Sequence, residues 1–399
     1  MQHDYIDSQQ ALESFAKSLQ DAEFISFDTE FVSEDTYYPE LCLVQVATDH
    51  QLAVIDPYRV QDMTPFWQGL AQGNHYTIAH AAREELRFCL RAVDAWPARL
   101  FDVQIAAGLV GLEYPAAYGK LIAKLLGVQL VKGETRTDWR RRPLTDRQIE
   151  YALQDVIYLK QLRDRIHADL VSLDRVSWLD DEMHSWQTEI EEAEKREKWR
   201  RVSGLSGLRE RSLVILRELW RWREGVAQAT NRPPRRILRD DLLIELSRRA
   251  KSDIKQIQAI RGLERSVSKR SLPEISDCIQ HALELPKSEW PAPLSRKPSS
   301  QATILGQFIA TALSSICRSQ KLAPGIVGTV QDVRDLVAYR LQPKQWTDEE
   351  VPALAQGWRA SVVGKTIDQL LDGSMSIRIQ DPLADEPLII EPNSNSPQT

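Results

Sequence analysis

The first half of the chain contains three short segments in which apolar and polar residues alternate. The clearest is residues 24–31, Phe-Ile-Ser-Phe-Asp-Thr-Glu-Phe. The other two are residues 41–47 and 52–55, which are separated from each other by a polar turn. Alternation with a period of two is typical of strands that have one face in a hydrophobic core, so this pattern predicts a meander of three strands. Apolar residues at helical spacing predict a short helix over residues 5–20.

Strands and helices alternate in the next hundred residues. A short strand at 77–80 leads into a helix, and a second strand ends at Asp102, which is placed to cap the helix after it. Thr145 and Gln148 have the spacing of a capping box and open a long helix that continues past Leu162. A meander followed by this alternation predicts a mixed α/β sheet with helices on both faces.

Beyond about residue 185 the apolar residues recur at helical spacing only. Residues 287–300 are rich in Pro, Ser and Lys, which is typical of a linker, and the tail from Asp381 is acidic and proline-rich. We divide the chain into an α/β domain (1–190), a linker helix with a first helical domain (191–286), a linker (287–300), a second helical domain (301–380) and a disordered tail (381–399).

The distribution of charge changes this picture more than the net charge does. The chain of 399 residues has a net charge of −6, but residues 195–251 contain 17 Lys and Arg against 7 Asp and Glu. The remainder contains 34 basic against 50 acidic residues. A basic block inside an acidic protein is a candidate surface for a polyanion, and a salt-bridged, solvated helix face is the structural alternative.

Cysteine usage and hydropathy exclude several classes of protein. The four cysteines, Cys42, Cys89, Cys278 and Cys317, are scattered and lack the spacing of zinc ligands. No apolar stretch approaches 18 residues, and the N-terminus has no basic segment followed by an apolar run. We therefore expect free thiols in a cytoplasmic protein without a membrane span.

Two carboxylates stand two residues apart near the end of the strand predicted at 24–31. Asp28 and Glu30 leave the same face of that strand, where mutual repulsion and burial both disfavour two negative charges. Hard oxygen ligands of this kind favour Mg²⁺ or Mn²⁺. By itself, the pair is equally typical of a solvated strand end.

Further acids follow on suitable elements. Tyr151 and Asp155 are four residues apart on the predicted long helix and share one face. An acid there would complete a metal site and a phenol one turn away would hold an attacking water, although a Tyr–Asp pair on a half-buried helix is the structural alternative. Glu84 and Glu85, which follow the strand at 77–80, offer a fourth carboxylate.

These residues lie in three motifs that occur in a familiar order: Phe27-Asp-Thr-Glu-Phe31, His80-Ala-Ala-Arg-Glu-Glu-Leu86 and Tyr151-Ala-Leu-Gln-Asp155. They resemble the motifs of the four-acid 3′→5′ exonuclease superfamily, in its tyrosine branch. The segment 136–145, Arg-Thr-Asp-Trp-Arg-Arg-Arg-Pro-Leu-Thr, is similar to ribonuclease D, and residues 206–286 resemble the helicase-and-RNase-D C-terminal domain. The resemblance implies a ribonuclease H-like exonuclease domain of mixed α/β sheet, followed by two small all-α helical domains.

The resemblance also implies an activity and a division of roles. We expect a divalent-metal-dependent 3′→5′ exoribonuclease that releases nucleoside 5′-monophosphates and trims tRNA precursors and other structured RNAs. Of two Mg²⁺ or Mn²⁺ ions, the first would be held by Asp28, Glu30 and Asp155 and the second by Asp28 and Glu85, while Tyr151 orients the attacking hydroxide. The expected protein is a monomer whose partner is RNA, and a helicase or another RNA-processing protein is a further candidate partner.

Six residues are candidates for contacting the nucleic acid. An aromatic ring beside the acids would stack on a base, and arginines or lysines would bind backbone phosphates. Packing over the sheet edge and bracing of a loop are the structural alternatives for the same residues. The candidates are Tyr37, Lys132, Arg136, Arg140, Arg235 and Arg236.

One position departs from the family pattern. The second motif carries Asp in the family, whereas Glu85 stands one methylene further from the backbone in this chain. If this change weakens the second metal, the protein would be a non-catalytic or weakly active RNA-binding protein. A 3′→5′ DNA exonuclease is a further alternative, and the helical domains would serve as docking modules if protein partners were their main ligands.

Overall fold

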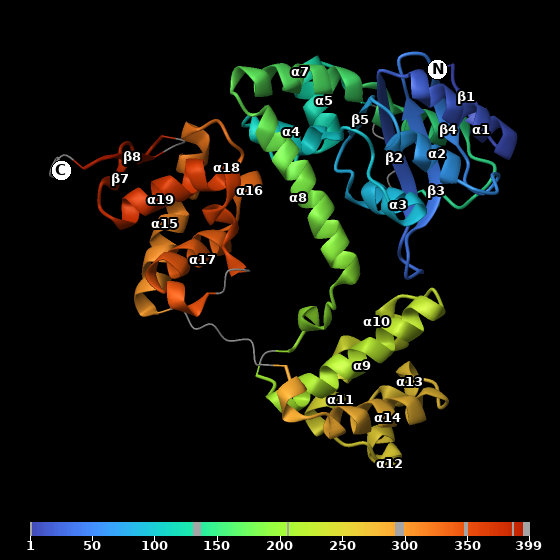
Figure 1. Cartoon of the computed structure of the whole chain (residues 1–399), viewed down its shortest axis with the longest axis vertical. Helices are drawn as coiled ribbons and strands as arrows, with labels where there is room; N and C mark the ends of the chain where they lie inside the picture. Colours follow the sequence, from blue (N-terminus) through green and yellow to red (C-terminus); the bar gives the residue numbers. More distant parts are fainter. Residues whose placement is uncertain are drawn as a thin grey trace. The chain divides into compact units, whose positions relative to one another are not determined.

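A computed structural model describes residues 2–130, 137–205, 207–291, 299–346, 350–384 and 387–393. In this part of the chain one sheet contains six strands in the order β1-β4-β3-β2-β5-β6 (Figure 1). They are β1 (Asp4–Ile6), β2 (Phe24–Val32), β3 (Glu40–Ala47), β4 (Leu52–Ile55), β5 (Tyr76–Ala79) and β6 (Phe101–Asp102).

The sheet is mixed, as the sequence pattern predicts. Strand β3 runs antiparallel to β4, whereas β1 is parallel to β4 and the series β2, β5 and β6 is parallel. The prediction of a helix over residues 5–20 is wrong at its start, because residues 4–6 form β1 beside β4. The helix begins at Gln9, where the Ser8 side chain accepts a hydrogen bond from the backbone N–H of Ala11.

Helices cover both faces of the sheet. Their bounds are α1 (Gln9–Ser18), α2 (Thr64–Ala71), α3 (Arg83–Val93), α4 (Val103–Leu109), α5 (Tyr118–Leu126), α6 (Asp146–Ile157), α7 (Leu159–Ser172) and α8 (Val176–Lys195). On one face, the Phe27 ring packs edge-on against Phe66 and Trp67 of α2. On the other face, Ile78 belongs to one hydrophobic core with α4, α5 and α7. Alternation along β2 therefore assigns Asp28 and Glu30 to the second face.

Local signals set the helix ends near the predicted acids. The Asp102 carboxylate accepts hydrogen bonds from the first turn of α4, which confirms its predicted role as an N-cap. Thr145 and Gln148 form both halves of the predicted capping box at the start of α6. The helix predicted to run past Leu162 is two helices, because the chain departs from regular α-helix at Tyr158.

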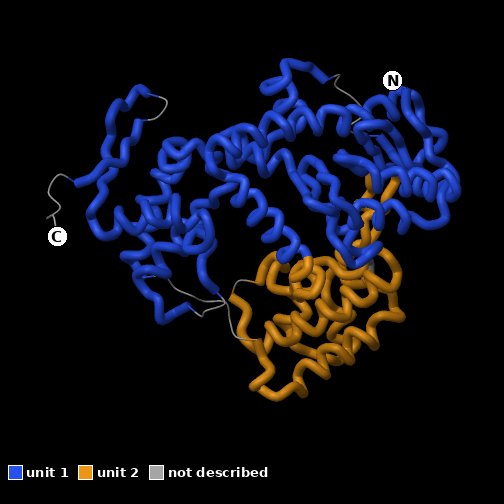
Figure 2. Tube along the Cα trace, turned by 45° about the horizontal axis from the view of Figure 1, so that its top comes forward, with its two compact units in different colours: residues 1–29, 43–190, 296–399 blue, residues 30–42, 191–295 orange. Residues whose placement is uncertain are grey.

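The helices after residue 299 pack into the same hydrophobic core as α4, α7 and α8. They are α15 (Ser300–Ser319), α16 (Pro324–Val327), α17 (Val330–Leu341), α18 (Gly357–Arg359) and α19 (Lys365–Leu371). Gly108 of α4 favours this close fit, because a Cβ there would lie 3.2 Å from the Cβ of Ile326. Compact unit 1 therefore comprises residues 1–29, 43–190 and 296–399, which differs from the predicted separation of a second helical domain (Figure 2).

Unit 2 comprises residues 30–42 and 191–295. Its helices enclose a hydrophobic core of their own, which contains Leu213, Leu243 and Ile275. The helices are α9 (Glu210–Ala229), α10 (Pro234–Ile237), α11 (Asp240–Arg249), α12 (Ile254–Gln258), α13 (Leu263–Ser266) and α14 (Ser271–Glu284). The predicted linker 287–300 begins with a 3₁₀ turn at Lys287–Glu289, and its residues 292–298 lie outside the described part.

The predicted disordered tail is corrected in part. Residues Leu388–Pro392 form β8, which pairs antiparallel with β7 (Met375–Ile379). The pairing is physically reasonable because Leu-Ile-Ile is a strand-forming run within an otherwise polar tail. Among the helices that the structure describes, none has the length and hydrophobicity needed to span a membrane.

Candidate active site

The first two acids lie in the second half of β2. Asp28 and Glu30 are half-buried and, two residues apart on one strand, project to the same face. The parallel neighbours β5 and β6 end at Ala79 and Asp102 at the same edge of the sheet. The carboxyl ends of parallel strands are the usual location of a site in such sheets.

Helix α6 contributes Asp155 to this region. Burial raises the pKa of the Tyr118 phenol, and the charges of Asp155 and Asp28 raise it further. The two acids therefore lie within electrostatic range of one side chain. The Tyr118 hydroxyl donates to the Gln154 carbonyl at 3.2 Å, which joins α5 to α6 beside Asp155. The sequence pattern did not identify Tyr118 as part of this site.

The Asp155 side chain is half-buried in surroundings that disfavour its charged form. Burial raises its pKa to about 7, and within the described residues burial is the one cause that acts on it. A carboxylate that loses hydration without gaining a hydrogen bond or a cation is costly to ionise. A bound divalent cation would remove that cost.

Tyr151 is held by a neighbour that the sequence analysis did not single out. The Trp139 ring stacks on the Tyr151 ring with the centroids 6.3 Å apart and an interplanar angle of 28°. Trp139 is itself buried, with an exposed fraction of 6%. The stack limits rotation of the Tyr151 ring and so fixes the direction of its phenol. The tryptophan inside the Arg-Thr-Asp-Trp-Arg-Arg-Arg segment was the available signal.

Glu85 reaches β2 from the side of Thr29. The Thr29 hydroxyl donates to Glu85 Oε1 at 2.6 Å, and the exposed fraction of Glu85 is 5%. Burial raises the pKa of Glu85 to about 7, although the Thr29 hydrogen bond opposes this shift. Thr29 lies between Asp28 and Glu30 in the sequence, but its side chain leaves the opposite face of the strand.

The other acids near this junction have different partners. Glu84 forms an ion pair with Arg87, one turn later on α3. Asp102 accepts the backbone N–H of Ala82 at 2.9 Å in addition to capping α4. His80 Nε2 lies 2.9 Å from the Ala116 carbonyl, so this histidine has a structural partner. Glu84 is therefore a poorer candidate for the fourth carboxylate than Glu85.

The predicted acids do not form a closed metal cage in this structure. Across the described ranges, no three or more His, Cys, Asp or Glu side chains lie close enough together to hold a metal ion. The acids nevertheless fit a hard cation, since Asp155 and Glu85 are buried oxygen donors with raised pKa values. Glu85 is bound instead to Thr29, whose side chain leaves the face of β2 opposite to Asp28.

The residues predicted to contact nucleic acid differ in their burial and in their present partners. Tyr37 is half-buried, and its hydroxyl lies 3.0 Å from Glu224 Oε2. Arg235 pairs with Asp240 at 3.1 Å, and the Arg236 guanidinium pairs with Asp35. Lys132 and Arg136 lie outside the described residues, so their predicted role stays a prediction.

The loop before α6 contains one phosphate-binding candidate and one structural arginine. Arg140 is half-buried, and its backbone N–H donates to Asp138 Oδ1 at 3.2 Å. Arg142 instead makes two hydrogen bonds to buried Asp56, at 2.6 and 2.8 Å. The hydrogen bonds to Arg142 and Tyr5 outweigh burial and lower the pKa of Asp56. Arg142 therefore braces the loop against β4 instead of presenting a free guanidinium.

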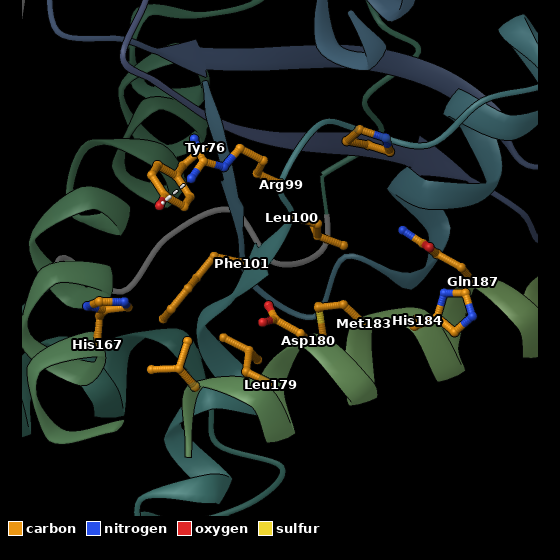
Figure 3. A pocket seen from close by; sticks show the side chains of 12 residues that line it. Tyr76, Arg99, Leu100, Phe101, His167, Leu179, Asp180, Met183, His184 and Gln187 are labelled. Carbon is orange, nitrogen blue, oxygen red and sulfur yellow. Dashed lines mark hydrogen bonds between the residues drawn. The ribbon is translucent and has the colours of Figure 1, made fainter. Parts of the chain in front are cut away.

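A pocket of about 460 Å³ lies at the amino ends of β5 and β6, at the edge of the sheet away from the predicted acids (Figure 3). Its lining includes Tyr76 and Arg99, which precede or begin these strands, with His167 from α7 and Asp180 from α8. It contains none of the predicted site residues. This pocket is therefore separate from the acids at the carboxyl ends of the strands.

Comparison with known families agrees with this arrangement. The 3′-5′ exonuclease family model matches residues 4–170, and the HRDC domain model matches residues 212–279. Ribonuclease D of Pseudomonas paraeruginosa is 31% identical over 351 residues, which cover 88% of this chain and 93% of the relative. Ribonuclease D of Zymomonas mobilis is 30% identical over 384 residues, which cover 95% and 96% respectively.

Solved structures of related proteins match most of the length of this chain. Escherichia coli RNase D, described as an exoribonuclease involved in structured RNA processing, superposes with a TM-score of 0.81 at 25% identity. The match covers 94% of this chain and 99% of that one. The catalytic core of RRP6 from Trypanosoma brucei shares the fold, with a TM-score of 0.53 at 21% identity over 71% of this chain and 80% of that one. The chain therefore belongs to the ribonuclease D family, and it is a 3′→5′ exoribonuclease.

Proposed function

We propose that this exoribonuclease depends on two divalent cations, Mg²⁺ or Mn²⁺, held by four acids from three parts of the chain. Asp28, Glu30 and Asp155 would hold the first ion, and Asp28 with Glu85 the second. The observation that carries the proposal is the burial of Asp155 and Glu85, whose pKa values are raised to about 7. Acids kept in such surroundings fit a site that is completed by a cation.

The ions would supply an activated water and stabilisation of the leaving 3′-oxygen at the phosphodiester. The protein residues would do the remaining work. The Tyr151 phenol, stacked on Trp139, orients the attacking water toward the phosphorus. The product is a nucleoside 5′-monophosphate, released one at a time from the 3′ end.

Glu85 has the most demanding role in this scheme. Its carboxylate is one methylene longer than that of Asp and is bound by Thr29. To share an ion with Asp28, the carboxylate would have to exchange the Thr29 hydroxyl for the metal and reach the face of β2 that carries Asp28. Membership of an exoribonuclease family favours this active arrangement over the non-catalytic alternative.

We propose tRNA precursors and other structured RNAs as substrates. The E. coli relative is described as acting in structured RNA processing, and the HRDC match at residues 212–279 overlaps the basic block at 195–251. Arg235 and Arg236 have exposed side chains whose present partners are carboxylates. Phosphates would compete for both guanidiniums, so affinity should depend on salt and little on sequence.

The test is digestion of a 3′-extended tRNA precursor by the full-length protein with Mg²⁺, with Mn²⁺ and with chelator. We expect 5′-monophosphates to appear only with metal. Asp28→Ala should lower the rate by at least about 1,000-fold, because the ions supply several kcal/mol of transition-state stabilisation. Activity in chelator, or faster digestion of DNA than of RNA with the same sequence, would overturn the proposal.

A further inference from the structure

The loop between β2 and β3 is fastened to the first helical domain inside unit 2. Residues 33–39 leave the strand of Asp28 and Glu30, and residues 30–42 belong to the same compact unit as α9 (Figure 2). Three side chains at the carboxyl end of α9 and just beyond it contact this loop. They are Glu224, Gln228 and Asn231.

The central contact is made by Asn231, just after α9. Its Oδ1 atom accepts the backbone N–H of Tyr37 at 3.1 Å and of Tyr38 at 3.2 Å. Two backbone donors on one acceptor fix the local path of the loop, whatever side chains it has. The Asn231 backbone has φ +46°, in the left-handed region that Asn tolerates better than most residues.

The Tyr37 side chain provides a second contact at the same place. Its hydroxyl donates to Glu224 Oε2 at 3.0 Å and accepts from Gln228 Nε2 at 3.1 Å. Glu224 and Gln228 are four residues apart, so both project from one face of α9. The Tyr37 ring also packs edge-on against Tyr38, with centroids 4.9 Å apart.

A third contact is weaker. The Arg236 and Asp35 side chains pair at 2.6 Å, but they are 56% and 47% exposed. Solvent screens such pairs, so this one adds little to the fixation of the loop. The contacts of Asn231 and Tyr37 are therefore the ones that a test should remove.

We infer that the carboxyl end of α9 is a positioning element for the exonuclease reaction, with Asn231 as its central positioning residue. The inference rests on the proposed function, because it assumes that Glu30 is a catalytic ligand. Glu30 is two residues from the end of β2, and the loop held by Asn231 begins directly after that end. Releasing the loop frees the end of the strand, and small misplacement of a catalytic group lowers the rate of the chemical step strongly.

This arrangement gives the first helical domain a second role, in which it positions the loop after β2 in addition to binding RNA. The residues that make the main contacts with the loop, Asn231, Glu224 and Gln228, are separate from Arg235, one of the two arginines that we propose for phosphate binding. Loss of the Asn231 contact should therefore lower kcat and leave the affinity for RNA nearly unchanged. Loss of a phosphate contact should have the opposite effect.

The experiment compares Asn231→Gly and Asn231→Asp in the full-length protein. Glycine keeps the left-handed backbone but removes the acceptor, whereas aspartate keeps an Oδ acceptor and should restore function. We expect Asn231→Gly to lower kcat about tenfold with KM within about twofold, and Asn231→Asp to stay within about threefold of the parent. Gln280→Ala is the matched control, since Gln280 accepts a hydrogen bond from Ser252 at 2.9 Å inside the same domain, away from the loop.

Hydrogen exchange provides a readout that does not depend on activity. The amides of Tyr37 and Tyr38 should exchange about tenfold faster in Asn231→Gly than in Gln280→Ala. Unchanged kcat, or a rise in KM alone, would overturn the inference. Asp28→Ala in the same assay separates the proposed metal site from the positioning role. Full activity of Asp28→Ala would overturn the metal site. If Asp28→Ala is inactive but Asn231→Gly keeps full kcat, the positioning role alone is wrong.

Discussion

Two buried acidic regions of unit 1 differ in how their charge is compensated. Glu182 of α8 is 6% exposed, and its carboxylate accepts from Arg359 at 2.5 and 2.9 Å and from the Trp358 indole at 2.8 Å. Asp155 of α6 is half-buried, and burial raises its pKa with no opposing hydrogen bond or charge among the described residues. The first region stabilises the fold, whereas the second stores an energetic cost that a ligand can relieve.

The contrast distinguishes Glu182, which stabilises the fold, from the acids of the candidate active site. Arg359 also donates to backbone carbonyls at Val327 and Ile326, and the Trp178 and Trp358 rings stack at 5.0 Å. The Glu182 carboxylate, the Arg359 guanidinium and the Trp358 indole therefore hold α8 to the last helices. At the candidate site, burial raises the pKa of Glu85 although the Thr29 hydroxyl and a backbone N–H donate to its carboxylate. Stability and function therefore make opposite demands on buried carboxylates in the same unit.

The largest predicted effect comes from breaking the compensated pair. Glu182→Ala leaves the Arg359 guanidinium and the Trp358 indole without their acceptor, and should lower the free energy of unfolding of unit 1 by about 3–5 kcal/mol. Urea unfolding followed by tryptophan fluorescence measures this change. A loss of less than about 1 kcal/mol would contradict the structural role assigned to this carboxylate.

The next effect has the opposite sign. In metal-free protein, Asp155→Asn should raise the free energy of unfolding at pH 8 by roughly 2–4 kcal/mol, because it removes a charge whose pKa is raised by burial. The same substitution should abolish exoribonuclease activity.

The pH dependence follows from the direction of the shift. The folded state binds the Asp155 proton more tightly than the unfolded state, so this group favours folding below pH 3.8 and opposes it progressively as the pH rises to about 7. The stability gain of Asp155→Asn should therefore grow across that window and then level off. A gain that is equal at pH 4 and pH 8 would exclude this explanation.

A smaller effect should follow removal of the hydroxyl that binds Glu85. Thr29→Val has nearly the same shape but cannot donate, so the metal-free protein should lose about 1–2 kcal/mol at pH 8. Added Mn²⁺ should restore more of the stability of this variant than of the parent protein, because the ion replaces the lost partner. Thermal unfolding with and without Mn²⁺ measures the loss of stability and its recovery. If Mn²⁺ stabilises Thr29→Val and the parent equally, the proposal that the ion replaces Thr29 as the partner of Glu85 is wrong.

The smallest effect should come from an exposed pair in the same unit. Arg340 pairs with Asp368 at 2.8 Å, and the two side chains are 36% and 40% exposed. Arg340→Ala should change the free energy of unfolding by less than about 1 kcal/mol, and less still at high salt. It is the control for Glu182→Ala, and a loss of similar size would show that burial does not explain the difference.

The sequence predicted those parts of the molecule that depend on local chemistry. The alternation in β2, the Asp102 cap and the Thr145 capping box each depend on residues within a few positions of one another. The order of the three motifs was sufficient to anticipate the family. Short-range patterns of this kind keep their meaning in any tertiary context.

Other features depend on contacts between distant segments. The Trp139–Tyr151 stack and the Thr29–Glu85 hydrogen bond join residues whose proximity exists only after folding. The packing of Gly108 against Ile326 likewise merges helices that have separate patterns in the sequence. No periodicity in a single chain reports such pairings, and that is why one predicted helical domain is part of the exonuclease core.

The most direct test of the central claim is calorimetric titration of Mn²⁺ into chelator-treated protein at pH 8, in parent, Asp155→Asn and Glu182→Gln forms. We expect the parent and Glu182→Gln to bind about two ions per chain and Asp155→Asn to lose at least one. Equal binding by the parent and Asp155→Asn would contradict the assignment of these buried acids to metal-dependent hydrolysis of RNA.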